Sequence, residues 1–169
     1  SASRGTVVRS MEGHTDLVSC VAVRGDVVVS AGRDRTIRLW SLRSGVCQVV
    51  LEGSEDQVYG LAIRNGRVLS GEGKVPRGKA RLWDLKSREM ISVFGEHAGP
   101  VWSVAVSKDQ CGITASFDGT ARIWSLADPG AVSSIATLTH PKGVYSVSIS
   151  DAGDLAATGC GDKLVRIWA

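Results

Sequence analysis

The sequence predicts an all-β chain made of four tandem repeats, and two regularities carry this prediction. First, four tryptophans recur at intervals of 43, 41 and 44 residues, each preceded by an arginine and an aliphatic residue; they are Trp40, Trp83, Trp124 and Trp168. Second, four six-residue runs align without gaps and start at Val18, Val58, Val101 and Val144. Each run alternates large apolar residues with small or polar ones, which is the period of a half-buried strand.

Two further apolar runs complete each repeat. One lies between the valine run and the tryptophan, as in residues 26–30, and another follows the tryptophan, as in residues 45–51 and 89–94. Glycine and aspartate separate the runs, and short strands at this spacing favour an all-β fold. No helical periodicity competes with this interpretation.

Composition narrows the functional classes. The 169 residues are 43% hydrophobic with a net charge of +3, and the lysines and arginines are scattered, so no nucleic-acid partner is expected. No apolar run approaches the ~20 residues of a membrane span and no signal peptide is present, so no membrane partner is expected. The four cysteines are far apart, which predicts reduced thiols and a cytoplasmic or nuclear protein. The chain starts without methionine, which indicates a processed or excised piece.

A unit of about 40–45 residues with four strands, a Gly-His start and a Trp end resembles the WD repeat. The resemblance extends from about Val7 to Ala169 and implies a single β-propeller domain over residues 1–169 with four blades. The repeats cover about 13–52, 53–95, 96–138 and 139–169. Only Trp83 is followed by the Asp that gives the repeat its name.

The resemblance also implies a structural tetrad of His, Ser or Thr, Asp and Trp in three repeats. The matching residues are His14, Ser30, Asp34 and Trp40; His97, Thr114, Asp118 and Trp124; and His140, Thr158, Asp162 and Trp168. The second repeat is degenerate, because Ser54 replaces the histidine and the turn aspartate is missing. Three extra residues over 71–80 predict a longer, looser hairpin loop there.

Catalytic and metal chemistry are not expected. Each histidine belongs to a different repeat, so a shared metal site is disfavoured, and the turn aspartates suit local backbone bonding. Residues 73–80 nearly match a phosphate-binding loop, but Ala80 replaces the metal-binding hydroxyl and the segment joins two strands rather than a strand and a helix. We therefore expect no enzyme activity, no catalytic residues, no metal and no cofactor.

Aromatic residues form the candidate binding surface. The residue after each aligned valine, and the residue before each turn aspartate, lie near the mouth of the central channel in WD-repeat proteins. These positions hold the candidate partner-binding residues Trp102, Phe117, Tyr59, Tyr145 and Arg33. Exposed Trp, Tyr and Arg are enriched in binding hot spots, although Trp102 and Tyr145 could equally pack against the neighbouring blade.

Four blades leave the closure of the ring open. Residues 6–11 align with an outer strand, whereas residues 164–168 form the third strand of a last blade that lacks its outer strand. The chain could close as a four-bladed ring, pair with a second copy, or be half of a longer propeller. We favour a homodimer in which each strand 6–11 joins strand 164–168 of the other chain, so that one chain is half of an eight-bladed ring.

The leading functional hypothesis is a non-catalytic scaffold that binds other proteins or peptides through the aromatic and arginine face. The alternatives are the substrate-recognition propeller of a ubiquitin ligase and a fragment of a larger WD-repeat protein. Short hairpins at residues 23–26 and 63–67 resemble those of F-box/WD-repeat receptors, which read phosphates with clustered arginines. Only Arg33 occupies a matching position, and no F-box is present.

Overall fold

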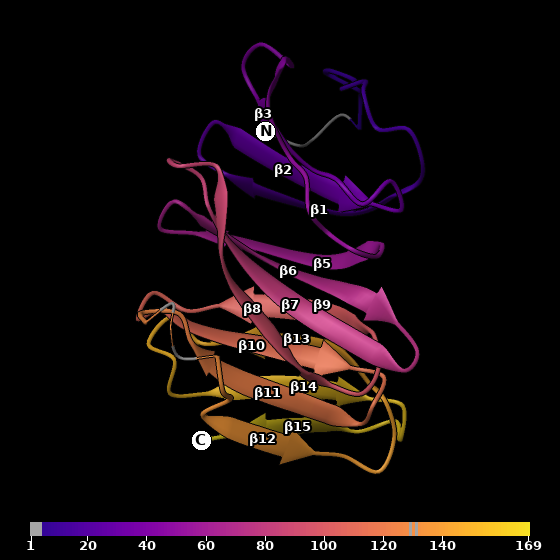
Figure 1. Ribbon diagram of the computed structural model, residues 1–169, viewed down its shortest axis with the longest axis vertical. Coiled ribbons are helices and arrows are strands. Elements are labelled where there is room, and N and C mark those ends of the chain that lie inside the picture. Colours follow the sequence, from indigo (N-terminus) through magenta and orange to yellow (C-terminus); the bar gives the residue numbers. More distant parts are fainter. Residues whose placement is uncertain (1–4, 129, 131) are drawn as a thin grey trace.

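The computed structural model describes residues 5–128, 130 and 132–169, and the regular elements of this part are all strands. The strands form four antiparallel sheets that succeed one another along the longest axis of the molecule (Figure 1). The predicted all-β architecture of repeated blades is therefore confirmed. Across the same described residues, no helix has the length and apolar character needed to cross a bilayer.

Each sheet is built from consecutive strands, so we call the sheets blades A to D in chain order. Blade A contains β1 (Val18–Arg24), β2 (Val27–Gly32), β3 (Ile37–Ser41) and β4 (Cys47–Leu51). Blade B contains β5 (Val58–Arg64), β6 (Arg67–Lys74), β7 (Arg77–Asp84) and β8 (Glu89–His97). Blade C contains β9 (Val101–Val106), β10 (Cys111–Ser116), β11 (Thr120–Ser125) and β12 (Ala136–Thr139). Blade D has three strands, β13 (Val144–Ile149), β14 (Ala156–Cys160) and β15 (Val165–Trp168).

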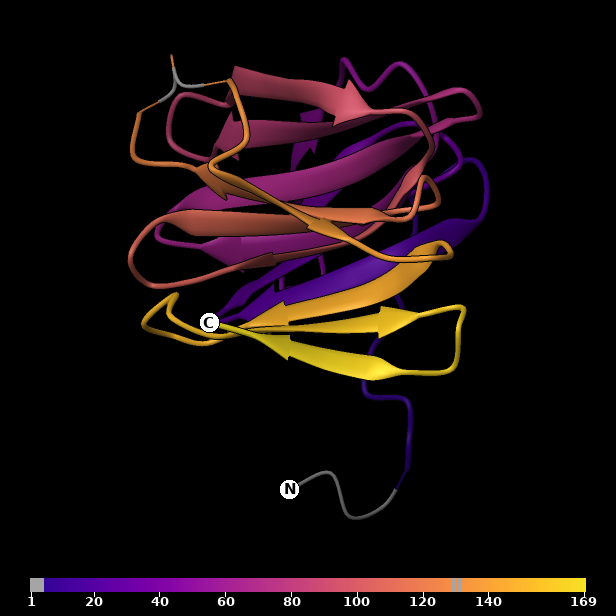
Figure 2. The same cartoon turned by 90° about the horizontal axis from the view of Figure 1, so that it is seen from below.

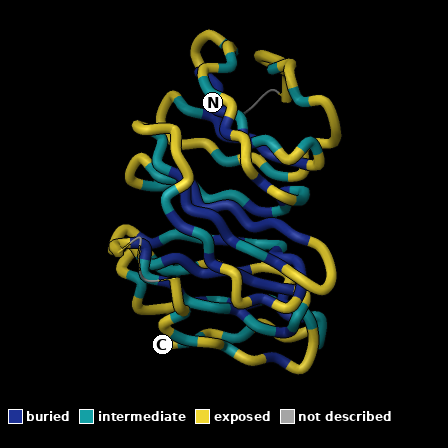
Figure 3. Tube along the Cα trace, viewed as in Figure 1, coloured by how far each residue is buried: buried dark blue, intermediate teal, exposed yellow. Residues whose placement is uncertain are grey.

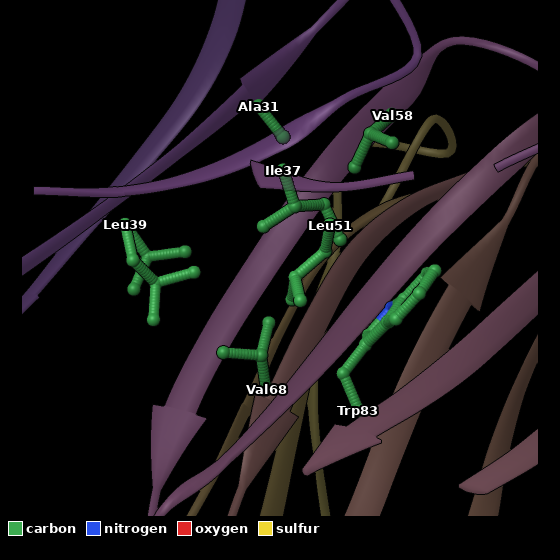
Figure 4. Packing of buried hydrophobic residues seen from close by; sticks show 8 residues of the cluster. Ala31, Ile37, Leu39, Leu51, Val58, Val68 and Trp83 are labelled. Carbon is green, nitrogen blue, oxygen red and sulfur yellow. The ribbon is translucent and has the colours of Figure 1, made fainter. Parts of the chain in front are cut away.

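The core lies between blades rather than inside any one of them. A sheet with apolar side chains on its faces must bury them against another layer, and here the partner layer is the next blade. Between blades A and B, for example, Ile37 and Leu51 pack with Val58, Val68 and Trp83 (Figure 4). Figure 3 shows the result, with buried residues concentrated in the middle strands and exposed residues at the turns and at the two ends of the stack.

The second repeat differs from the predicted loose loop. The extra residues extend β6 and β7, which stay in register through Glu72↔Lys79, Gly73↔Gly78 and Lys74↔Arg77. Only Val75 and Pro76 remain as the turn. The expectation of a loose loop was wrong because each added residue found a cross-strand partner. The near-match to a phosphate-binding loop thus lies in a strand, turn and strand.

The two ends of the stack are open. Residues 6–11 form no strand within the single chain, and Val7 and Val8 are highly exposed. Blade D, drawn in yellow in the lower part of Figure 2, ends at β15 and has no fourth strand. The chain is therefore an open arc of blades, and the pairing of residues 6–11 with another chain stays a prediction.

Candidate functional site

Four polar side chains form one hydrogen-bonded chain inside blade A. The indole of Trp40 donates to Ser30 Oγ at 2.8 Å, and Ser30 Oγ lies 2.7 Å from His14 Nε2. His14 Nδ1 lies 2.6 Å from Asp34 Oδ2. Because the carboxylate only accepts, Nδ1 carries the proton and Nε2 accepts from the serine hydroxyl. These hydrogen bonds connect β2, β3, the turn between them and the segment that precedes β1.

Blade C repeats this arrangement with a threonine. Trp124 donates to Thr114 Oγ1 at 2.9 Å, His97 Nε2 lies 2.7 Å from the same oxygen, and His97 Nδ1 lies 2.9 Å from Asp118 Oδ2. Burial alone would raise the pKa of Asp118. The hydrogen bonds from His97 and Thr120 outweigh burial and hold this pKa well below its usual range. The pKa of Asp34 in blade A is lowered against burial in the same way.

Blade D departs from the expected tetrad. Trp168 and His140 share Thr158 Oγ1 at 2.9 and 2.8 Å, but His140 Nδ1 bonds to the carbonyl of Leu138 instead of a carboxylate. Asp162 accepts from Arg166 at 2.6 Å, which lowers the pKa of Asp162. The corresponding arginine in blade C, Arg122, contacts Ser134 near the outer strand. Arg122 also binds Glu96, whereas Arg166 of blade D, which has no outer strand, binds Asp162.

Blade B replaces the histidine and aspartate with a buried ion pair. Trp83 still donates to Ser70 Oγ at 3.0 Å. Beside it, the guanidinium of Arg81 binds Glu72, and both side chains are almost fully buried. Burial raises the pKa of Glu72, and the bond from Arg81 only partly offsets that rise. The sequence analysis missed this pair; the signal was a Glu and an Arg in the repeat that lost its His and Asp.

The candidate binding residues on the inner strands occupy β-bulges. Each inner strand skips one residue in its pairing with the next strand; the skipped residues are Ser19, Tyr59, Trp102 and Tyr145. A bulge leaves the extra residue unpaired and re-aims its side chain. The same local irregularity therefore presents one side chain per blade at the same edge of the stack.

The residues before the turn aspartates lie next to these bulges. The amides of Arg33, Phe117 and Gly161 donate to the carbonyls of Leu17, Pro100 and Gly143 at 2.9–3.1 Å. These carbonyls directly precede the inner strands. The loops between β2 and β3, β10 and β11, and β14 and β15 therefore border the bulge edge of the stack.

Three of the predicted residues form an aromatic cluster, which we define as Trp102, Phe117 and Tyr145. The rings of Trp102 and Tyr145 stack with centroids 4.5 Å apart, and Phe117 meets Trp102 edge-on at 5.2 Å. Phe117 and Tyr145 are 50% and 56% exposed. The rings therefore pack across blades C and D and still leave exposed area, and their role in binding a partner stays a prediction.

The other two predicted residues lie on blades A and B, apart from the ring contacts of the aromatic cluster. Arg33 is exposed, and Tyr59 is half-buried with its hydroxyl bonded to Gln57. Burial raises the pKa of Tyr59, and the nearby charge of Arg33 counteracts part of that rise. The edge therefore carries a cationic, polar part and an aromatic part.

Two observations bear on metal binding and on thiol chemistry in the described part of the chain. No group of three or more His, Cys, Asp or Glu residues there could hold a metal ion. Burial raises the pKa of the Cys20 thiol to about 11, which disfavours a reactive thiolate. Cavities of about 330 and 300 Å³ lie beside the β6–β7 hairpin and between blades B and C, away from the aromatic cluster.

Comparison with known families gives one matching family model, described as the WD domain, G-beta repeat. It matches residues 5–41, 88–125 and 132–169, which together make up more than half of the chain. The unmatched interval contains most of the second repeat, which keeps the Trp83–Ser70 bond but has Ser54 in place of the histidine and the buried Glu72–Arg81 pair.

Individual relatives cover the chain almost completely. Autophagy-related protein 16 of Arabidopsis thaliana is 32% identical over 99% of this chain and 34% of its own length. Small ribosomal subunit protein RACK1 of Drosophila melanogaster is 26% identical over 93% of this chain and 52% of its own. The chain spans only 13% of the length of another relative, the DENN domain and WD repeat-containing protein SCD1 of Arabidopsis thaliana.

One solved structure, the computationally designed Ika4 protein, has the same fold. It superposes with a TM-score of 0.82 over 97% of this chain and 98% of its own, at 22% sequence identity. At this identity, the similarity shows the fold alone.

Proposed function

The chain belongs to the WD-repeat family, and from this premise we propose that it is a non-catalytic scaffold that binds proteins or peptides at the bulge edge of its blades. Members of a family can share a fold and differ in function, so the proposal is built on the residues of the edge. The observation that carries it is the aromatic cluster, in which Trp102 is flanked by two half-exposed rings.

The chemistry of this edge suits a peptide segment with an apolar or aromatic side chain. Large, rigid aromatic side chains provide contact area at small entropic cost and dominate hot spots. Trp102 and Tyr145 already hold each other in place by stacking, so little ordering would be needed on binding. Arg33, on the other part of the edge, offers a cationic group for an acidic residue of the same partner.

A peptide array tests this proposal. Trp102→Ala and Phe117→Ala should each weaken the peptides that the unmodified chain retains by at least about tenfold, as loss of a hot-spot ring does. Val75→Ala serves as the control, because Val75 is a similarly exposed apolar residue at the tip of the β6–β7 hairpin. Retention that is indifferent to both aromatic substitutions would contradict the proposed site.

Phosphorylated peptides on the same array address the ubiquitin-ligase alternative. A receptor of that kind would prefer phosphorylated over unmodified peptides, and Arg33→Ala would abolish that preference. The absence of a phosphate preference leaves the general scaffold function as the better proposal. The whole-protein activities of the relatives are not transferred here, since the chain covers only part of their length.

We propose further that the ring is completed by a second copy, each strand 6–11 pairing along β15 of the other chain. Residues 6–11 have no strand partner in the single chain, while β15 has a free edge. Strand addition to a free edge supplies main-chain hydrogen bonds. Val8→Pro should weaken the dimer, because proline removes an N–H and is poorly tolerated in a paired strand; an unchanged dimer constant would show that this strand does not pair.

The proposed location of the protein is the cytoplasm or nucleus, where the four free cysteines would remain reduced. Fluorescence imaging of the tagged chain together with a compartment marker tests this. Accumulation in the secretory pathway would contradict it.

A further inference from the structure

Every contact between neighbouring blades uses the same two surfaces. We call the side that a blade turns toward the next blade its forward face, and the opposite side its rear face. At the A–B contact, Ile37 and Leu39 of the forward face pack with Val58, Val68 and Trp83 of the rear face, as Figure 4 shows. These faces therefore form a defined pair of apolar surfaces.

The same positions recur at the other two contacts. At the B–C contact, Ala80 and Leu82 take the places of Ile37 and Leu39, and they cluster with Val101, Val104 and Trp124. At the C–D contact, Ala121 and Ile123 take these places and cluster with Val144, Val147 and Trp168. Each contact thus joins the third strand of one blade to the first strand and tryptophan of the next.

The rear face of blade A carries the equivalent residues and, within the described part of the chain, packs against no neighbouring blade; Val18 and Val21 are exposed there, whereas Val28 and Trp40 are buried. Val18, Val21, Val28 and Trp40 correspond to Val58, Leu61, Val68 and Trp83 by strand register. Val21 is 64% exposed, whereas its counterpart Val104 in blade C is buried. A cavity of about 240 Å³ opens on this face and is lined by Met11, Val18, Val21, Val28 and Trp40, among others. At the internal contacts, the corresponding rear face of each blade is covered by the forward face of the preceding blade.

The forward face of blade D carries the matching projections. Val165 and Ile167 occupy the positions of Ile37 and Leu39, and they are 74% and 67% exposed, whereas Ile37 and Leu39 are buried. Leu155 also lies exposed at this end. Exposed apolar residues that gather on one surface, rather than scattering singly, mark an interaction site.

We propose that the forward face of blade D docks on the rear face of blade A of a second copy, with Val165 and Ile167 entering the hollow beside Val21 and Trp40. The occupant is a copy of this chain, since its faces reproduce, position by position, the pair that packs at all three internal contacts. A two-fold axis forms this contact twice and buries both open ends in a ring of eight blades. This inference deepens the proposed assembly and rests on it, but locates the binding energy in the sheet faces rather than in strand 6–11.

Sedimentation of the full chain tests the faces directly. The unmodified chain should sediment at twice the 17.8 kDa of one chain. Val165→Lys with Ile167→Lys, and separately Val21→Lys, should weaken the dimer by at least about a hundredfold, because each places a charge in an apolar contact that forms twice. Circular dichroism should stay unchanged, since these side chains are exposed in the single chain.

Val75→Lys is the matched control, with the same chemical change at a residue that is 62% exposed and outside both faces; it should remain a dimer. A monomeric unmodified chain would overturn both the assembly and this inference, as would open-ended oligomers. A dimer that tolerates the lysines on both faces but dissociates with Val8→Pro would overturn the inference and leave the strand-paired assembly standing. Peptide binding by the monomeric variants reports separately on the aromatic cluster.

Discussion

Blades B and C hold their central tryptophans by the same bond and surround that bond with different chemistry. In blade C, Thr114 Oγ1 accepts from Trp124 and also contacts His97, and His97 in turn binds the carboxylate of Asp118. In blade B, Ser70 Oγ accepts from Trp83 and donates to the backbone carbonyl of Arg81, and the Glu72–Arg81 ion pair lies beside it. The shared part is therefore the indole–hydroxyl bond, and the rest can be exchanged provided that the buried polar groups are paired.

The difference has an energetic consequence. In blade C, hydrogen bonds keep the outer carboxylate of Asp118 ionised. The ion pair of blade B buries two charges, and one carboxylate oxygen of Glu72 has no hydrogen-bond partner. Removing one charge from a buried pair costs about 3–5 kcal/mol, whereas leaving a buried polar group without a partner costs about 1–3 kcal/mol.

The largest expected effect is in blade B. Arg81→Ala should lower the free energy of unfolding by about 3–5 kcal/mol, because it leaves the carboxylate of Glu72 buried without its cation. The double variant Glu72→Leu with Arg81→Leu should recover most of this loss, since no buried charge remains. Urea denaturation measures both; a double variant as unstable as Arg81→Ala would show that the pair acts through packing alone.

The next effect separates a complete tetrad from an incomplete one. His97→Ala should lower the free energy of unfolding by about 1–3 kcal/mol, because it leaves the buried Thr114 hydroxyl and the Asp118 carboxylate short of a partner. His140→Ala in blade D should cost less, because His140 bonds to a carbonyl and not to a carboxylate. Equal losses in the two variants would mean that the aspartate adds nothing to the network.

The smallest expected effect is a difference in pH dependence. The pKa of Asp118 is lowered by folding, so the stability it contributes is present above its unfolded pKa of about 4 and is lost as the pH falls below that value. The pKa of Glu72 is raised by folding, so its charged form costs stability as the pH rises above about 4.5.

Urea denaturation between pH 3 and 7 separates these two contributions. Asp118→Asn should reduce the loss of unfolding free energy at acid pH. Glu72→Gln should reduce the loss of unfolding free energy as the pH rises above about 4.5. Unchanged profiles in both variants would remove these carboxyl groups from the pH dependence.

Much of the architecture followed from local pattern. The tryptophan spacing and the alternating valine runs located all four blades, because strand periodicity and turn formation depend on residues that are close together in the sequence. The same alignment pointed to Tyr59, Trp102 and Tyr145 as equivalent residues, and the structure places each of them at a bulge.

Other features depended on groups that are distant in sequence. In blade D, which lacks an outer strand, Asp162 binds Arg166 and His140 binds the carbonyl of Leu138, so the expected bond between His140 and Asp162 is absent. The register of the β6–β7 hairpin could likewise not be predicted from the sequence, since extra residues can form either a loop or longer strands. The burial of Glu72 beside Arg81 depends on packing around that hairpin.

The sequence by itself determined the number of blades, their strands and the residues that share a position in each repeat, because these depend on short-range periodicity. Only the tertiary structure decided which faces are left without a partner. Val21 and Val165 resemble buried residues of the other blades in type and position, and their exposure appears only once the stack is seen to be open. Burial is a property of what lies across a contact, and no local pattern contains that information.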